Sequence, residues 1–184
     1  STSDRHSRIN SNHQIWTLIY PGERSIDAAY RLTSKCGMDN RQQRRLAAKA
    51  RAQEIQSHMN AARNAMQGGD AVAAERECQA ALGVDPLAAE PHHLLAHIAY
   101  GQGRLQNAGD HILEAATRDD GNLEIHADCG AIMNMLGRGA EAEAACRHVL
   151  EHKPSHAEAC NNLSVAIDIQ GRWTEALVVC EEAL

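Results

Sequence analysis

Phenylalanine is absent from this sequence, and other aromatic side chains are scarce, with two Trp and three Tyr among 184 residues. The interior must therefore be built from Ala, Leu, Ile, Val, Met and Cys, and such a core packs small side chains closely. Long hydrophobic runs are also missing. The longest apolar stretch near the start, residues 15–20, is too short for the core of a signal peptide or for a membrane span.

Signatures of catalysis and of disulfide chemistry are missing too. The six Cys include no Cys-x-x-Cys pair, and without a secretory signal they indicate a cytoplasmic protein with reduced thiols. The sequence has no glycine-rich phosphate loop, no nucleophile elbow, no His-Glu-x-x-His and no pair of catalytic carboxylates. It therefore predicts no catalytic residue, no cofactor and no metal site.

The net charge of −6 is divided unevenly along the chain. Residues 1–54 carry ten Lys and Arg against five Asp and Glu, whereas residues 55–184 carry eight against nineteen. An acidic region binds nucleic-acid phosphates poorly, so nucleic acid is not expected as a partner of residues 55–184. The same charge suits basic or polar peptide segments.

What the sequence does contain is a repeat of 34 residues. Three sets of residues recur in one register: the glycines Gly69, Gly103, Gly137 and Gly171, the alanines Ala74, Ala108, Ala142 and Ala176, and the set Pro86, Asp120 and Pro154. This period is the length of one helix–turn–helix unit. Glycine is expected to end the first helix, alanine to lie where two helices cross, and proline to follow the second helix.

The pattern resembles the tetratricopeptide repeat (TPR) family, because several positions agree in register over residues 55–184. The resemblance implies four units, 55–88, 89–122, 123–156 and 157–184. It implies an all-α fold in which antiparallel helix pairs stack into a right-handed superhelical solenoid. First helices would line the concave face of this solenoid.

The array departs from the family at position 4 of each unit, where the family usually has Trp or another large residue. Here this position holds His58, His92, His126 and Cys160. We expect the three His to be half-buried structural residues. The smaller side chains reduce the buried area per unit, which predicts modest stability.

The residues before the array show no repeat. Residues 1–37 are expected to form an irregular leader, and we hypothesise that Met38 is the physiological start, because the following residues resemble the opening of many bacterial TPR proteins. Residues 38–54 are expected to form a basic helical lead-in. A solvated helix face is the simplest interpretation of its charges, with docking on the acidic array, and contact with a membrane surface or nucleic acid, as alternatives.

His93 and His97 are four residues apart on the first helix of the second unit, so both can lie on one side of that helix. Two such side chains supply half of a zinc site, but the sequence shows no third ligand. A second run of His with the same spacing is interrupted by Pro154. We therefore interpret these histidines as packing residues or as polar residues of the groove.

The concave groove is the best candidate for a functional surface. Its predicted contacts are polar and charged positions of the first helices: Gln56, Asn60, Arg63, Glu90, His93, His97, Tyr100, Glu124, Asp128, Asn134, Glu158, Asn161, Asn162 and Asp168. The asparagines can hydrogen-bond a peptide backbone without reading its sequence. Because this groove is acidic, a chaperone C-terminal carboxylate is disfavoured as a ligand.

Two functions fit such an array. The first is a cytoplasmic protein–protein interaction scaffold that binds a peptide or protein segment, especially a basic one, in the concave groove. The second is the substrate-recruiting N-terminal arm of a larger bacterial glycosyl-, methyl- or sulfotransferase, because the fourth unit and the Arg-rich opening are similar to repeat regions that precede such domains.

Self-assembly is a further expectation. A solenoid needs a polar cap on its last apolar face, and none follows the fourth unit. The apolar residues expected to form an open edge there are Leu163, Ile167, Leu177 and Val178. A second copy of the chain could cover such an edge.

Overall fold

The computed structural model describes residues 40–182, so the predicted leader of residues 1–37 lies outside the described part of the chain. The chain divides into two compact units, Ser1–Gln53 and Glu54–Leu184, which we describe separately. The described residues of the first unit, 40–53, are the N-terminal half of the helix α3 (Asn40–Gln67). The side chains of all five Lys and Arg in this half are exposed.

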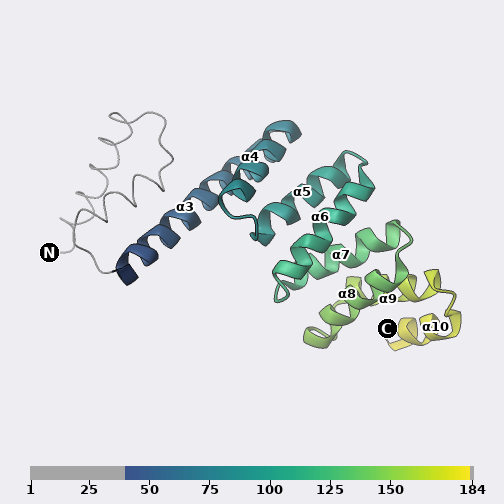
Figure 1. Ribbon diagram of the computed structural model, residues 1–184. Coiled ribbons are helices and arrows are strands. Elements are labelled where there is room, and N and C mark those ends of the chain that lie inside the picture. Colours follow the sequence, from purple (N-terminus) through teal and green to yellow (C-terminus); the bar gives the residue numbers. More distant parts are fainter. Residues whose placement is uncertain (1–39, 183–184) are drawn as a thin grey trace. The chain divides into compact units, whose positions relative to one another are not determined.

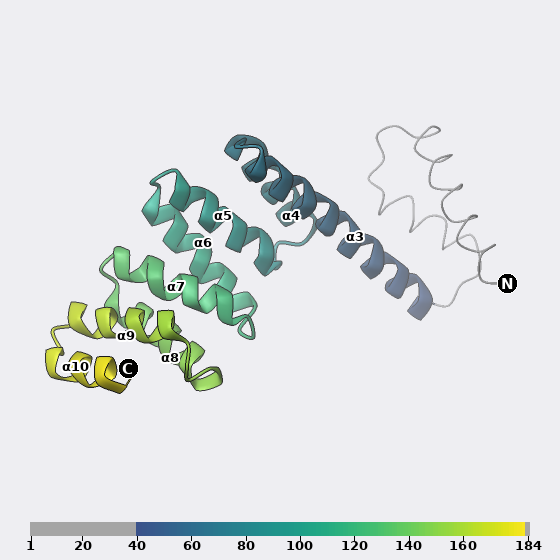
Figure 2. The same ribbon diagram turned by 180° about the vertical axis from the view of Figure 1, so that it is seen from behind.

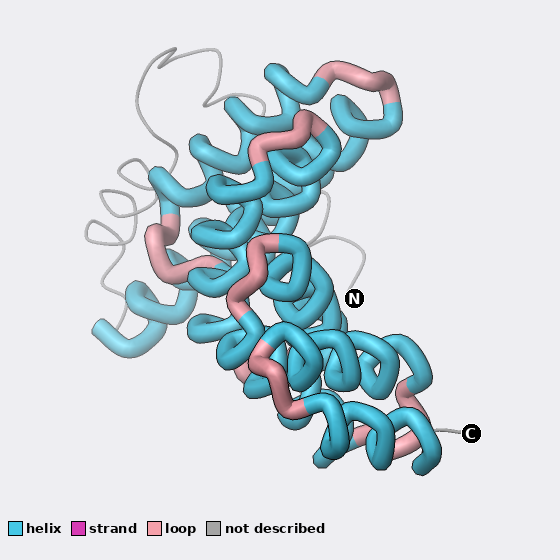
Figure 3. Tube along the Cα trace, turned by 90° about the vertical axis from the view of Figure 1, so that its right-hand side faces the viewer, coloured by secondary structure: helices cyan, strands magenta, loops and turns pink. Residues whose placement is uncertain are grey.

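The second unit is built from helix hairpins that follow one another in chain order (Figure 1). After the C-terminal part of α3 come α4 (Ala71–Val84), α5 (Ala89–Gly101), α6 (Leu105–Arg118), α7 (Leu123–Met135), α8 (Gly139–His152), α9 (Ala157–Ile169) and α10 (Trp173–Glu182). No strand occurs among residues 40–182 (Figure 3). The all-α solenoid of helix–turn–helix repeats is thus confirmed.

The turn inside each hairpin is closed by glycine. Gly69, Gly103, Gly137 and Gly171 all have φ between 71° and 78°, in the left-handed region that only glycine enters without strain. In the third hairpin the Gly137 amide donates to the Asn134 carbonyl (3.0 Å), and the Arg138 amide donates to the Met133 carbonyl (2.9 Å). This pair of bonds is the Schellman arrangement, which satisfies the last carbonyls of α7.

The turns between hairpins use different residues. α4 ends at Val84 and α8 at His152, and Pro86 and Pro154 follow within two residues, as the sequence predicts. Asn122 begins α7 by accepting hydrogen bonds from the amides of Glu124 and Ile125. This cap satisfies amides that have no partner within the helix.

Small side chains occupy the positions where helices cross. Ala74, Ala108 and Ala142 are completely buried. Gly130 allows a close approach, since a Cβ at this position would lie 2.5 Å from Cys146 Sγ on the neighbouring α8. The repeated small residues therefore set the spacing of the hairpins, as a core with so few aromatic residues requires.

Each hairpin also packs on the next. Contacts join α4 to α5, α6 to α7, α8 to α9, and α7 to α9, in addition to those within the hairpins. The largest buried cluster lies between the α5/α6 and α7/α8 hairpins and includes Ile112, Ile125 and Met133. Figure 2 shows the same sequential order from the other side.

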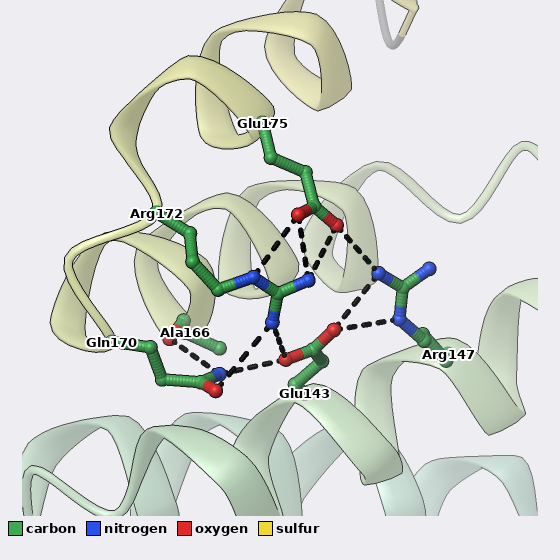
Figure 4. Close-up of polar contacts among 6 residues, drawn as sticks. All are labelled: Glu143, Arg147, Ala166, Gln170, Arg172 and Glu175. Carbon is green, nitrogen blue, oxygen red and sulfur yellow. Dashed lines mark hydrogen bonds and ion pairs between the residues drawn. The ribbon is translucent and has the colours of Figure 1, made fainter.

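An ion network joins α8 to the last hairpin (Figure 4). Glu143 on α8 accepts hydrogen bonds from Gln170 (2.7 Å), Arg172 (2.6 Å) and Arg147 (2.9 Å). Arg172 and Arg147 also bind Glu175 on α10. Burial raises the pKa of Glu143, but the three donors outweigh that effect and lower it to about 2.

The predicted apolar edge at the fourth unit needs correction. Leu163 and Ile167 are buried, with 4% and 0% of their surface exposed, because Val179 and Ala176 of α10 pack against them together with Cys146 of α8. The second helix of a hairpin covers the inner face of the first, so apolar residues on that inner face are not exposed. Of the other predicted residues, Val178 is half exposed, and the side chain of Leu177 lies outside the description.

Candidate protein-binding face

The residues predicted for binding lie on the first helix of each hairpin. We call the surface formed by residues 54–67 of α3 together with α5, α7 and α9 the first-helix face. It carries all fourteen predicted residues, none of which is fully buried. Tyr100 is the most apolar of them and is 48% exposed.

A polar group at the N-terminal end of this face is centred on Arg63. Its guanidinium donates to Asn60 Oδ1 (3.1 Å) and forms an ion pair with Glu90 on α5. Gln56 donates to the same Asn60 oxygen (3.3 Å). The charge of Glu90 is therefore compensated within the chain, which reduces its value for a basic ligand.

The centre of the face holds His93, His97 and Asp128. Asp128 Oδ2 lies 2.7 Å from His93 Nε2 and 3.0 Å from His97 Nε2, and the two ring nitrogens lie 3.0 Å apart. Asp128 is therefore a third potential ligand beside the His pair, which the sequence alone does not reveal. Asp128 comes 35 residues after His93, one more than the repeat, so the next first helix places it beside the His pair.

The charges of this group stabilise one another. Burial raises the pKa of Asp128, but hydrogen bonds from His93 and His97 outweigh burial and hold that pKa well below its ordinary value. The hydrogen bond to Asp128 raises the pKa of His97. Asp128 is therefore ionised at neutral pH and His97 is more easily protonated than an isolated histidine.

Two asparagines join α7 to α9. Asn134 Nδ2 donates to the backbone carbonyl of Asn162 (2.8 Å). Asn134 Oδ1 and Asn162 Nδ2 are buried without a hydrogen-bond partner among the described residues. The neighbouring Asn161 has an exposed side chain. The first two side chains thus contribute to helix packing, whereas Asn161 faces solvent.

Three acidic residues of the face remain uncompensated. Glu124 on α7, and Glu158 and Asp168 on α9, are exposed and their carboxylates form no ion pair with another described residue. The structure thus separates the predicted acidic residues into two kinds. Glu90 and Asp128 have partners within the chain, and the other three are available to a ligand.

The position-4 histidines lie away from this group. His58 binds Glu77 (2.9 Å) and His92 contacts His111 (3.3 Å), each partner being on the second helix of the same hairpin. His126 is 8% exposed, and its Nε2 has no hydrogen-bond partner within the described residues. Burial lowers the pKa of His126, with the neighbouring His148 acting in the same direction. These His are partly or fully buried packing residues.

Sequence reasoning missed a second group near His126. His148 Nε2 lies 2.8 Å from the Asp120 backbone carbonyl, and the rings of His126 and His148 are 4.1 Å apart. A pocket of about 350 Å³ adjoins them between α6, α7 and α8. The sequence feature that could have indicated this group is the 22-residue separation of His126 and His148, which places them on the two helices of one hairpin.

Another pocket, of about 410 Å³, lies between α8, α9 and α10 and is lined in part by Leu150, Cys160 and Val179. Neither pocket is lined by a residue predicted for binding. Within the described residues, no helix combines the length and apolar character needed to cross a membrane.

Comparisons with known proteins agree with this architecture. Residues 59–122 match the tetratricopeptide repeat model. The O-GlcNAc transferase of Thermobaculum terrenum is 27% identical with a TM-score of 0.55, and the match covers 64% of this chain but 22% of that enzyme. This chain thus corresponds to about a fifth of the enzyme. A search of curated proteins found no match.

Two further solved structures share the fold at lower identity. MamA from Desulfovibrio magneticus RS-1 is 15% identical with a TM-score of 0.63, over 71% of this chain and 73% of that one. A tetratricopeptide repeat protein from Parabacteroides merdae is 22% identical with a TM-score of 0.60, over 71% and 52% of the two chains. The helix hairpins, the 34-residue period and the family match over residues 59–122 together show a tetratricopeptide repeat architecture, and repeats of this kind imply a scaffold for protein–protein interaction.

Proposed function

We propose that the first-helix face binds an extended or helical segment of another protein, and that this segment is basic. The observation that carries the proposal is the set of uncompensated carboxylates on neighbouring helices, Glu124, Glu158 and Asp168. They provide negative potential along the face, and Asn161 and Tyr100 add exposed polar and aromatic contacts. In this proposal the protein is a bacterial scaffold that acts in the cytoplasm.

The charge balance of the face supports unequal contributions from its carboxylates to binding of a basic segment. Glu90 is paired with Arg63 and Asp128 with two His, so a basic ligand would have to displace existing partners there. No such displacement is needed at Glu124 or Glu158. These two residues should therefore supply more of the attraction than Glu90 does.

The test uses a library of Lys-rich peptides, with a Glu-rich library as the counterpart. The Glu124→Gln/Glu158→Gln variant should bind the best Lys-rich peptide about three- to tenfold more weakly, and its binding should depend less on salt. Glu151→Gln is the matched control, because Glu151 is an exposed carboxylate on the second helix α8 that forms no ion pair with another described residue. Unchanged affinity and salt dependence in the double variant, or preference for the Glu-rich library, would contradict the proposal.

A second candidate function is recruitment of substrate for a larger transferase. The likeness to a fifth of the Thermobaculum terrenum O-GlcNAc transferase favours it. In this case the first-helix face would hold a protein substrate for a catalytic domain of the glycosyl-, methyl- or sulfotransferase type. Sequencing the gene downstream of the Leu184 codon separates the two candidates: a nucleotide-sugar or S-adenosylmethionine domain supports recruitment, and a stop codon after a solvating helix supports the scaffold.

A further inference from the structure

Three potential metal-ligand atoms converge at the centre of the first-helix face. His93 Nε2, His97 Nε2 and Asp128 Oδ2 form a triangle with edges of 2.7, 3.0 and 3.0 Å. They come from two different hairpins, so the triangle exists only when α5 and α7 are stacked. We propose that His93, His97 and Asp128 bind one divalent first-row transition-metal ion, with Zn²⁺ as the representative.

Hydrogen bonding alone satisfies this triangle poorly. A neutral imidazole has one N–H and one acceptor nitrogen. If one Nε2 carries its proton, it can donate to only one of its two neighbours, and the other nitrogen then faces the carboxylate with a lone pair. If both carry protons, both can donate to Asp128 Oδ2, but the two N–H groups then lie next to each other, with their nitrogens 3.0 Å apart. A cation at the centre is attracted by all three lone pairs at once.

The distances are close to those of a metal site. Zinc lies about 2.0–2.2 Å from His nitrogen and carboxylate oxygen, so tetrahedral ligand atoms are about 3.3 Å apart. The edges observed here need to widen by a few tenths of an ångström, which side-chain rotation can supply. Neither His93 Nδ1 nor His97 Nδ1 bonds to another described residue, so the ring proton can move to Nδ1 and free Nε2 for the metal.

The surroundings allow an ion to enter. The side chains of His93, Asp128 and His97 are 16%, 29% and 45% exposed. Three protein ligands leave at least one coordination position for water or for a donor from a bound partner. Two imidazoles and one carboxylate suit Zn²⁺, Co²⁺, Ni²⁺ and Fe²⁺ rather than Mg²⁺ or Ca²⁺, which prefer oxygen ligands alone.

The group formed by Asp120, His126 and His148 provides an internal comparison. It has the same residue types, but its ring nitrogens lie 3.6 and 3.9 Å from Asp120 Oδ1. His148 Nε2 is also occupied by the Asp120 carbonyl at 2.8 Å. The looser geometry and the competing hydrogen bond make this group the weaker ligand set.

The experiment is calorimetric titration of the full chain with Zn²⁺ and with Co²⁺ in buffer free of chelators. The variants are His97→Gln and Asp128→Asn, which keep polar side chains of similar size, and His148→Gln is the matched control. Circular dichroism verifies that each variant is as helical as the wild type. Because the leader is the same in all four proteins, any binding by its histidines cancels in the comparison.

We expect one site in the wild type whose affinity falls at least tenfold in His97→Gln and Asp128→Asn and is retained in His148→Gln. Occupation of that site should also raise the melting temperature of the wild type, because the ion binds only where two hairpins are stacked. Absence of a site in the wild type, loss confined to His148→Gln, or any other pattern among the variants overturns the proposal.

Discussion

The α7/α8 hairpin is joined to its two neighbours by different chemistry. Towards α9/α10 the contact is ionic, with Glu143 accepting from Gln170 and Arg172 (Figure 4). Towards α5/α6 the corresponding contact is apolar. There a Cβ added to Gly109 would lie 2.5 Å from Leu136 Cδ1, so the leucine already fills the space of a side chain.

The repeat makes these two contacts equivalent. Arg172 and Glu143 are 29 residues apart, as are Arg104 and Glu75, which are also hydrogen-bonded (3.0 Å). In the middle of the array, the residue 29 positions before Arg138 is Gly109, which offers no carboxylate. Arg138 instead binds Glu141 in its own hairpin (2.8 Å). The same pair of repeat positions is therefore occupied by Glu143 and Gln170 in one contact and by Gly109 and Leu136 in the other.

The difference shows that equivalent positions between neighbouring hairpins can be filled by different side-chain chemistry. It also predicts that an ionic contact can replace the apolar one only if both residues of the pair, Gly109 and Leu136, are substituted together. Gly109→Glu alone should lower the free energy of unfolding by about 2–4 kcal/mol, because a buried carboxylate must displace Leu136. Adding Leu136→Gln should recover at least about 1 kcal/mol, since glutamine can donate to the carboxylate as Gln170 does.

Urea denaturation of the two single variants and the double variant measures this coupling. Leu136→Gln alone is the control for the lost apolar contact. Strictly additive effects of the two substitutions would show that the two positions are not exchangeable as a pair.

Alanine substitutions at Gly139 and Gly109 compare the two contacts of the α7/α8 hairpin, with a smaller expected loss of stability. A Cβ at Gly139 would lie 2.8 Å from the Ala166 backbone carbonyl, which cannot move without shifting α9. Gly139→Ala should therefore cost about 1–3 kcal/mol. Gly109→Ala should stay within about 1 kcal/mol of the wild type, because Leu136 can rotate and alanine favours the helix interior by about 1 kcal/mol. Equal losses of melting temperature in the two variants would contradict this distinction.

The ionic contact should give the smallest effect and a characteristic pH dependence. The folded-state pKa of Glu143 is lowered to about 2 from an ordinary value of 4.5. Its stabilisation is therefore present above about pH 5 and is lost as the pH falls towards 2, because the unfolded chain binds the proton first. Glu143→Gln should cost about 1 kcal/mol at neutral pH, since Arg147 and Arg172 are 47% and 40% exposed.

Unfolding curves of the wild type and Glu143→Gln at several pH values provide the check. The difference between the two proteins should shrink as the pH falls from 5 towards 2. Glu151→Gln changes an exposed carboxylate that has no ion-pair partner within residues 40–182, and it should leave the wild-type pH profile intact. A difference that stays constant with pH would mean that the charge of Glu143 does not stabilise the fold.

Periodicity predicts most of this architecture from the sequence. The position of Gly137 in the repeat predicts its left-handed turn, and that of Pro154 predicts the end of α8, because both depend on local backbone geometry. The partners of Glu90 and of the His93/His97 pair could not be predicted in the same way. These contacts depend on how far one hairpin is shifted along the next when the two stack. The 34-residue repeat does not specify that shift, so it does not specify which side chains come into contact.

The same limit explains the error at the last hairpin. The sequence interpretation predicts that Leu163 and Ile167 lie on an exposed apolar edge, because it treats the two helices of the fourth unit as one surface. The two helices of the hairpin turn their apolar residues towards each other and towards α8, so these side chains are buried. Which face of a helix remains exposed is a property of packing rather than of composition.

In the proposed function, a segment of a partner protein lies along the first helices. Hydrogen–deuterium exchange of the full chain, with and without its best Lys-rich peptide, tests this most directly. We expect the peptide to slow exchange in α5, α7 and α9 while α6 and α8 keep their rates. Protection confined to the second helices α6 and α8 would contradict the account.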